Sequence, residues 1–156
     1  MSRHSKIELS AGFLAVLCAY FYFDPAGTFF PFCFSALLHE AGHLLCLRLL
    51  GAEVRRMRLS CCGAVICTDI LPYGKEIAAA ASGPCVNLLL LFLYMRREPL
   101  TALINFCLLT YNLLPFYPLD GGRILRAVLH LMLRDTVAET TEPVSYTHLR
   151  AHETGR

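Results

Sequence analysis

Charged side chains are scarce in this chain: they make up 17% of its 156 residues, against about 25% in an average soluble domain. Hydrophobic residues reach 56%, and the mean hydropathy is +0.51. This composition argues against an ordinary soluble domain and indicates a membrane α-helical protein with one domain. The net charge is only +2, so nothing indicates a nucleic-acid partner.

We expect neither a disulfide framework nor a cleavable leader in this chain. Most of its cysteines lie within apolar runs, where a free cysteine behaves as a small hydrophobic residue. The adjacent pair Cys61-Cys62 lacks the C-x₂-C spacing of a zinc site. Arg3 and Lys6 precede an apolar run, but Asp24-Pro25 ends that run without a small-residue cleavage site. We therefore expect a retained first membrane span.

One pattern with clear chemistry is His39-Glu40-Ala41-Gly42-His43, which reads H-E-x-x-H. On a helix, residues four apart lie one turn apart on the same face, so His39 and His43 could bind one zinc ion. Glu40 is placed beside the first ligand, where it could act as a general base on a water activated by the metal.

The motif lies inside a run of membrane type, with no other charge from Ala26 to Leu47. The simpler alternative is that three polar residues line a bundle interior by chance. An ionisable group in a spanning helix costs about 2.5–3.5 kcal/mol on insertion scales, so such groups are rarely idle. This cost favours a functional site.

The apolar runs predict about four transmembrane helices. The first covers Leu9–Phe23, the second starts near Thr28 and ends near Gly51, and the others cover Ile77–Met95 and Leu100–Leu119. Between the second and third, β-branched residues predict a small hairpin with strands Val54–Ser60 and Ala64–Asp69. A final helix is expected over Ile124–Leu133, dipping into the membrane interface.

Asn87 follows Ser82-Gly83-Pro84, where glycine and proline are expected to break or kink the third helix. Two interpretations of its amide stay open. It could satisfy backbone groups that Pro84 frees, or it could point into the active cavity.

Asp120 also has two interpretations. It could cap the helix that follows it. However, a pair of histidine ligands needs a third protein ligand, and zinc accepts carboxylate. Gly121 and Gly122 would let the backbone approach the metal-binding helix closely. These considerations favour Asp120 as the third ligand.

Residues 1–134 are expected to form the core, and residues 135–156 a tail outside it. The segment from Val144 onward resembles translated sequencing-adapter read-through. We therefore expect the natural gene product to continue differently, and we exclude His148, His152 and Glu153 as metal ligands.

Flanking arginine and lysine residues set membrane orientation. With four spans, one side carries nearly all of them, while the other carries Arg96 and Arg97. This asymmetry predicts a cytoplasmic N-terminus and a cytoplasmic hairpin. His43 then lies about 10 Å below the cytoplasmic end of its helix.

Three elements, taken together, resemble the site-2 protease family of intramembrane zinc metalloproteases. They are His39–His43, Ser82–Asn87 and Asn112–Gly122, and the similarity looks greatest to the bacterial branch of stage IV sporulation protein FB. The resemblance implies Zn²⁺ held by His39, His43 and Asp120, with Glu40 as general base. It also implies that Asn87 lies near the scissile peptide and that the hairpin guides the substrate.

The chain is thus predicted to hydrolyse peptide bonds within or near transmembrane segments of membrane-protein substrates. It would work as an integral protein of a bacterial cell membrane, with the lipid bilayer and a regulatory membrane protein as further partners. The first alternative is a non-catalytic membrane scaffold that retains a structural metal site. Glu40 argues against it, since such a site needs no base. The second is a metal transporter, which would need polar residues along several spans.

Overall fold

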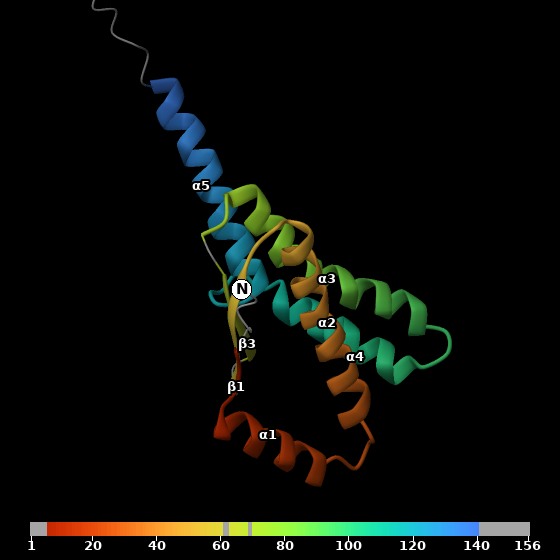
Figure 1. Cartoon of the computed structure of the whole chain (residues 1–156). Helices are drawn as coiled ribbons and strands as arrows, with labels where there is room; N and C mark the ends of the chain where they lie inside the picture. The colour runs from red at the N-terminus through yellow and green to blue at the C-terminus, as the bar shows by residue number, and fades with distance from the viewer. Residues whose placement is uncertain (1–5, 61–62, 69, 141–156) are drawn as a thin grey trace, which may run out of the picture.

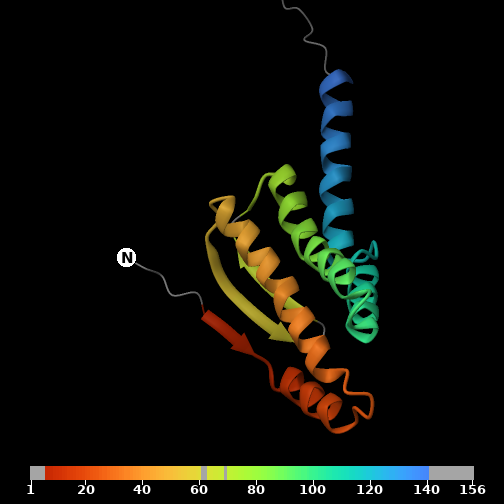
Figure 2. The same cartoon turned by 90° about the vertical axis from the view of Figure 1, so that its right-hand side faces the viewer.

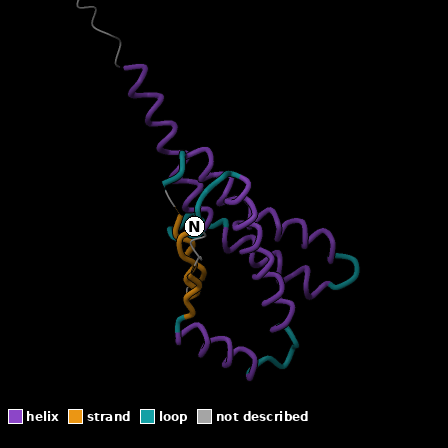
Figure 3. The backbone as a smooth tube through the Cα atoms, in the orientation of Figure 1, coloured by secondary structure: helices purple, strands orange, loops and turns teal. Residues whose placement is uncertain are grey.

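The computed structural model describes residues 6–60, 63–68 and 70–140 (Figure 1). The element order is β1 (Lys6–Leu9), α1 (Ala11–Tyr22), α2 (Phe29–Leu49), β2 (Val54–Ser60), β3 (Gly63–Thr68), α3 (Tyr73–Tyr94), α4 (Pro99–Asn112) and α5 (Asp120–Thr140). Helices dominate the fold, and the strands form one small sheet (Figure 3).

α3 is the central helix, because it packs against α2, α4 and α5. Contacts from His43 to Ala79 and from His39 to Gly83 show that α2 and α3 run antiparallel. The close approach depends on Gly42, where a Cβ would lie 2.8 Å from Val86 Cγ2 and 3.1 Å from the Ser82 carbonyl. Small residues at such a crossing let two apolar helices pack backbone to backbone.

The sheet has the order β1-β2-β3 and stands beside α2, with α1 across its lower end in the view of Figure 2. β2 and β3 pair antiparallel over the region predicted as a hairpin, with Ser60 opposite Gly63. The predicted turn at Cys61-Cys62 lies outside the described residues. β1 pairs parallel with β2, from Lys6 opposite Arg56 to Leu9 opposite Leu59. This third strand was not predicted, because its residues were assigned to the flank of the first span.

Two of the described helices, α2 and α3, are long and apolar enough to cross a membrane. The expectation of four spans is therefore not supported. α1 has 12 residues and α4 has 14, which correspond to about 18 and 21 Å at 1.5 Å per residue. Leu9, the first residue of the first run, belongs to β1, and the helix of the run from Leu100 ends at Asn112, before Pro115 and Pro118.

Asp24 stabilises the loop between α1 and α2 through hydrogen bonds. Its carboxylate accepts hydrogen bonds from the Phe29 backbone N–H and the Thr28 hydroxyl, both at 2.7 Å. The Phe29 bond is the main cause that lowers the pKa of Asp24 below its usual range. At the other end, Gly51 has a φ of +73°, the left-handed conformation expected just past a helix. Both predicted boundaries of the metal-motif helix are therefore close to the observed ones.

α5 begins four residues earlier than predicted and continues to Thr140, past the expected core boundary at residue 134. Its C-terminal part extends away from the other elements in both views (Figures 1 and 2). Near its start, Arg126 donates to Glu76 of α3 at 2.7 Å, and His130 stacks on Tyr73 at 4.9 Å between ring centroids. These contacts fix the first turns of α5 against the start of α3.

Candidate metal centre

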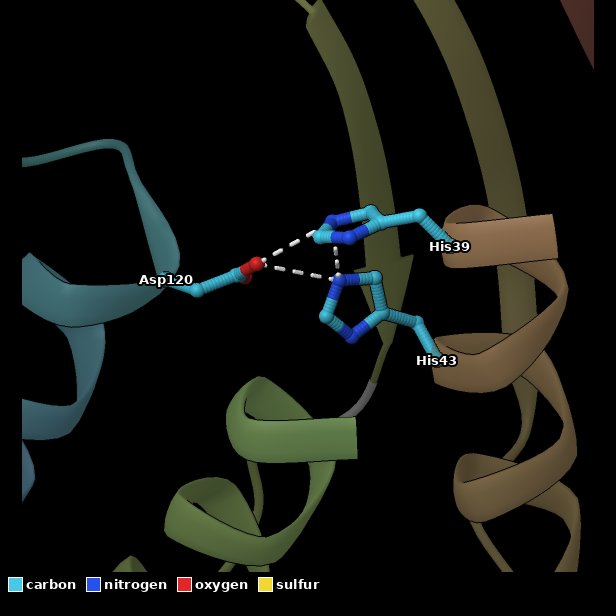
Figure 4. A group of neighbouring side chains, drawn as sticks. All are labelled: His39, His43 and Asp120. Carbon is cyan, nitrogen blue, oxygen red and sulfur yellow. Dashed lines mark hydrogen bonds and ion pairs between the residues drawn. The ribbon is translucent and has the colours of Figure 1, made fainter. Parts of the chain in front are cut away.

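His39, His43 and Asp120 meet in the interior, although Asp120 is 77 residues beyond His43 (Figure 4). All three are buried, with 5%, 5% and 6% of their surface exposed. Asp120 Oδ2 lies 3.2 Å from His39 Nε2 and 3.1 Å from His43 Nε2. The two Nε2 atoms are 3.1 Å apart. Three potential ligand atoms thus form a nearly equilateral triangle.

This triangle fits a tetrahedral zinc ion. Zinc bonds of about 2.0–2.2 Å to nitrogen and oxygen place neighbouring ligand atoms roughly 3.3–3.5 Å apart. The observed separations of 3.1–3.2 Å are close to that value. Two imidazoles and one carboxylate leave a fourth position open, as in catalytic zinc sites.

The ring of His43 is oriented by α3. Its Nδ1 donates to the carbonyl oxygen of Ala79 at 2.7 Å, so Nε2 carries the lone pair that faces the other two residues. Such an outer hydrogen bond is usual for metal-binding histidines, because it fixes both tautomer and orientation. The Ser82 hydroxyl donates to the same carbonyl at 2.7 Å.

Asp120 reaches the histidines as the first residue of α5, not from the position before the helix. Its second oxygen, Oδ1, lies 3.5 Å from Arg123 Nη1. The expected role of the following glycines needs correction. A Cβ on Gly121 would collide with the Leu113 backbone, and one on Gly122 with the Phe116 backbone. The glycines therefore let α5 start against its own preceding loop, and not against α2.

Glu40 is half-buried on α2, beside His39 in sequence, and it is not one of the three residues that converge. Asn87 is fully buried on α3. Neither polar atom of its side chain has a hydrogen-bond partner within the described residues. The described structure therefore gives no support to the interpretation that Asn87 satisfies backbone groups, and α3 continues through Pro84 without a break.

Gly83 is a site residue that sequence reasoning missed. A Cβ there would lie 2.6 Å from His43 Cε1, 2.7 Å from His39 Cε1 and closer still to His43 Nε2. The signal was present in Ser82-Gly83-Pro84, but glycine beside proline suggested only a kink. Ser35 and Asn105 were also missed. Both are fully buried polar residues, Ser35 on the apolar helix α2 and Asn105 on α4.

Comparison with known proteins gives consistent matches. Residues 99–152 match the model of peptidase family M50. A zinc metalloprotease of Methanocaldococcus jannaschii is 32% identical over 108 residues, which are 61% of this chain and 32% of that protein. The chain thus spans about a third of the length of this relative.

The fold has a solved counterpart in the site-2 protease from Methanocaldococcus jannaschii. The TM-score is 0.66 at 27% sequence identity, and the match covers 83% of this chain and 69% of the other. The shared fold, the family match and the convergence of His39, His43 and Asp120 agree with one another. The chain is thus similar to peptidase family M50 over residues 99–152 and shares its fold with a site-2 protease.

Proposed function

We propose that this chain is the core of an intramembrane zinc metalloprotease that cleaves membrane-protein substrates within or near their transmembrane segments. The observation that carries the proposal is the triangle of His39 Nε2, His43 Nε2 and Asp120 Oδ2 with sides of 3.1–3.2 Å. His39, His43 and Asp120 would hold the zinc ion. When bound, zinc supplies Lewis acidity, which activates water and polarises a peptide carbonyl.

Glu40 is the general base in this proposal. Its carboxylate takes a proton from the attacking water as the water oxygen bonds to the carbonyl carbon of the substrate. The same carboxyl group then gives that proton to the amine that leaves when the C–N bond breaks. Asn87, one turn along α3 from Gly83, which faces both histidines, would contact the peptide backbone near the scissile bond. The substrate must be extended there, because the amides of a helix are engaged in their own hydrogen bonds.

The alternative is a scaffold in which the metal is only structural. Such a site has four closed ligands as a rule, whereas a three-residue set leaves one position open. A half-buried carboxylate beside the ligands is also unnecessary for a structural metal. These features favour the protease.

Replacing Asp120 by asparagine is expected to remove most of the bound zinc. The substitution keeps the shape of the side chain but takes away the anionic ligand. The loss of zinc affinity should exceed the 10–100-fold that is typical when an outer-shell partner is removed. Zinc per chain, measured by elemental analysis of purified protein, tests this. Asp24→Asn, the same change in the α1–α2 loop, should keep full zinc. Full occupancy in Asp120→Asn would mean that the ligand set is wrong.

The strands are proposed to lie on the cytoplasmic side, together with the N-terminus. The basic residues beside the two described spans, α2 and α3, are unevenly distributed: the α2–α3 connection has more of them than the opposite end, which has Arg96 and Arg97. This asymmetry supports the orientation, and the pairing of β1 with β2 places the N-terminal strand beside the other two. In a variant that keeps only Cys61 and Cys62, an impermeant thiol reagent should label these residues from the cytoplasmic side of oriented vesicles. Labelling from the opposite side alone would reverse the topology. The bacterial origin, the sporulation branch, the regulatory partner and the division at residue 134 stay predictions.

A further inference from the structure

The three largest fully buried side chains of the described structure are all polar: Asn87, Asn105 and Ser35, each with 0% exposure. They come from three helices, α3, α4 and α2 respectively. We call them the polar layer. In a membrane-type core such groups are costly unless they are paired or functional, so the layer needs an explanation.

The polar layer lies one helical turn from the metal centre. Ser35 lies four residues before His39 on α2. Asn87 lies four residues after Gly83 on α3, and a Cβ on Gly83 would contact both imidazoles. Because α2 and α3 are antiparallel, both steps lead in the same direction, about 6 Å along the helices. The layer therefore sits directly beyond His39, toward the start of α2.

Asn105 occupies the same level. Its Nδ2 donates to Ser35 Oγ at 2.9 Å, which places it against α2. Asn87 lies seven residues before the end of α3 at Tyr94, and Asn105 lies six residues after the start of α4 at Pro99. α3 and α4 pack against each other and are joined by a short loop. Because the two asparagines are almost equally far from this loop along their helices, their positions along the helix axes differ by about one residue.

The hydrogen bonds of the layer are incomplete. Asn105 Nδ2 uses both of its hydrogens, on Ser35 Oγ and on the Thr101 carbonyl, each at 2.9 Å. Asn105 Oδ1, Asn87 Oδ1 and Asn87 Nδ2 are buried and have no partner within the described residues. Nearly all buried polar groups in native proteins are paired with protein or with ordered water. Two acceptors and one donor at a single level thus call for a shared partner.

The protein backbone freed by proline cannot be that partner for Asn87. Pro84 frees the carbonyl of the residue four positions earlier, Ala80. That carbonyl lies seven residues, or about 10 Å, before Asn87 along the helix. Because the layer is fully buried in the described structure, a molecule that completes its hydrogen bonds there must be small. A buried water typically makes about three hydrogen bonds to polar groups of this kind.

We propose that the polar layer binds an internal water molecule between Asn87 and Asn105, one turn from the metal-binding histidines. The water donates to Asn105 Oδ1 and completes the hydrogen bonding of the Asn87 amide. Only the role of this water in catalysis rests on the proposed function. In that role the water would hold the Asn87 amide in position to contact the substrate backbone. Water binding itself does not require the chain to be a protease.

The composition of the chain makes the test direct. Its asparagines are Asn87, Asn105 and Asn112, and it has no glutamine. A ¹⁵N-labelled sample in detergent micelles should therefore give three side-chain NH₂ pairs, which single Asn→Asp variants assign. The Asn87 and Asn105 pairs should show water-to-amide NOE cross-peaks with the sign of a long-lived bound water. Asn112, half-buried and bonded to the Leu108 carbonyl of its own helix at 3.0 Å, is the internal reference.

In Asn105→Leu, the bound-water cross-peak of Asn87 should disappear, while the Asn112 signal stays unchanged. Ser35→Ala is a milder second variant, because it removes one acceptor of Asn105 and keeps the site polar; there the cross-peak should persist. The absence of bound-water cross-peaks at both amides in the folded wild-type chain would overturn the proposal. Glu40→Gln adds one side-chain NH₂ pair of its own, but the cross-peaks of Asn87 and Asn105 should be unaltered, so failure of the protease mechanism leaves this test intact.

Discussion

Replacing Glu40 by glutamine is expected to lower kcat for peptide cleavage by about 10²–10⁴-fold, the usual contribution of a general base. Glutamine keeps the shape of the side chain and can still hydrogen-bond, but it cannot accept the proton of the attacking water. Glu40 is outside the triangle of His39, His43 and Asp120. Zinc content should therefore stay near the wild-type value, and only the chemical step should fail. The measurement is cleavage of a model transmembrane substrate in liposomes, with zinc determined on the same samples.

A matched control separates this effect from a general loss of charge. Glu98 is exposed in the α3–α4 loop, at the end of α3 far from Ala79 and Gly83. Glu98→Gln makes the same chemical change and should leave both cleavage and zinc content unaltered. Undiminished cleavage by Glu40→Gln would contradict the proposed mechanism. Loss of zinc together with cleavage would instead give Glu40 a structural role, as the scaffold alternative allows.

The metal motif was predictable from sequence because it is local. The four-residue spacing of His39 and His43 is enough to place two imidazoles on one face of a helix. Asp120 required the additional argument that a third ligand must come from elsewhere, since no short-range pattern links it to the histidines. Its 3.1–3.2 Å separations from them depend on how α5 packs against α3.

The fold was less predictable where apolar runs of similar composition form different structures. Composition alone does not distinguish a spanning helix from a shorter one, so Leu9–Phe23 and Leu100–Leu119 were both interpreted as full spans. In the structure, Leu9 belongs to a strand, and α4 stops at Asn112. Pairing of β1 with β2 is a contact between residues about 50 apart, and a periodicity within either segment carries no information about it.

The polar residues Ser35 and Asn105 illustrate the same limit. Each is a polar residue within a largely apolar run, and either could have faced a loop, a lipid headgroup or another helix. Their hydrogen bond joins residues 70 apart in sequence. Only the packing of α2, α3 and α4 brings them to the level of Asn87.

Gly83 is where tertiary packing should have the largest effect on metal binding. A Cβ at this position would lie 2.6–2.7 Å from ring carbons of both histidines and closer to His43 Nε2. Real Cβ atoms essentially never come this near, so either the imidazoles or the whole of α3 must move. Gly83→Ala should therefore lower zinc affinity by at least about 10²-fold, the upper range for changes that only misorient a ligand.

Two further Gly→Ala changes identify why Gly83→Ala would lose zinc. Gly74→Ala adds the same methyl group to α3 where nothing lies within 4 Å, and it should keep full zinc. Gly42→Ala tightens the same α2–α3 crossing, but its Cβ would meet Val86 Cγ2 and the Ser82 carbonyl instead of an imidazole. It should lower the thermal midpoint with a smaller loss of zinc. Equal zinc loss in Gly42→Ala and Gly83→Ala would assign the effect to helix separation. Full zinc occupancy in a folded Gly83→Ala chain would contradict the contact altogether, because the alanine methyl and the two imidazoles cannot share that space.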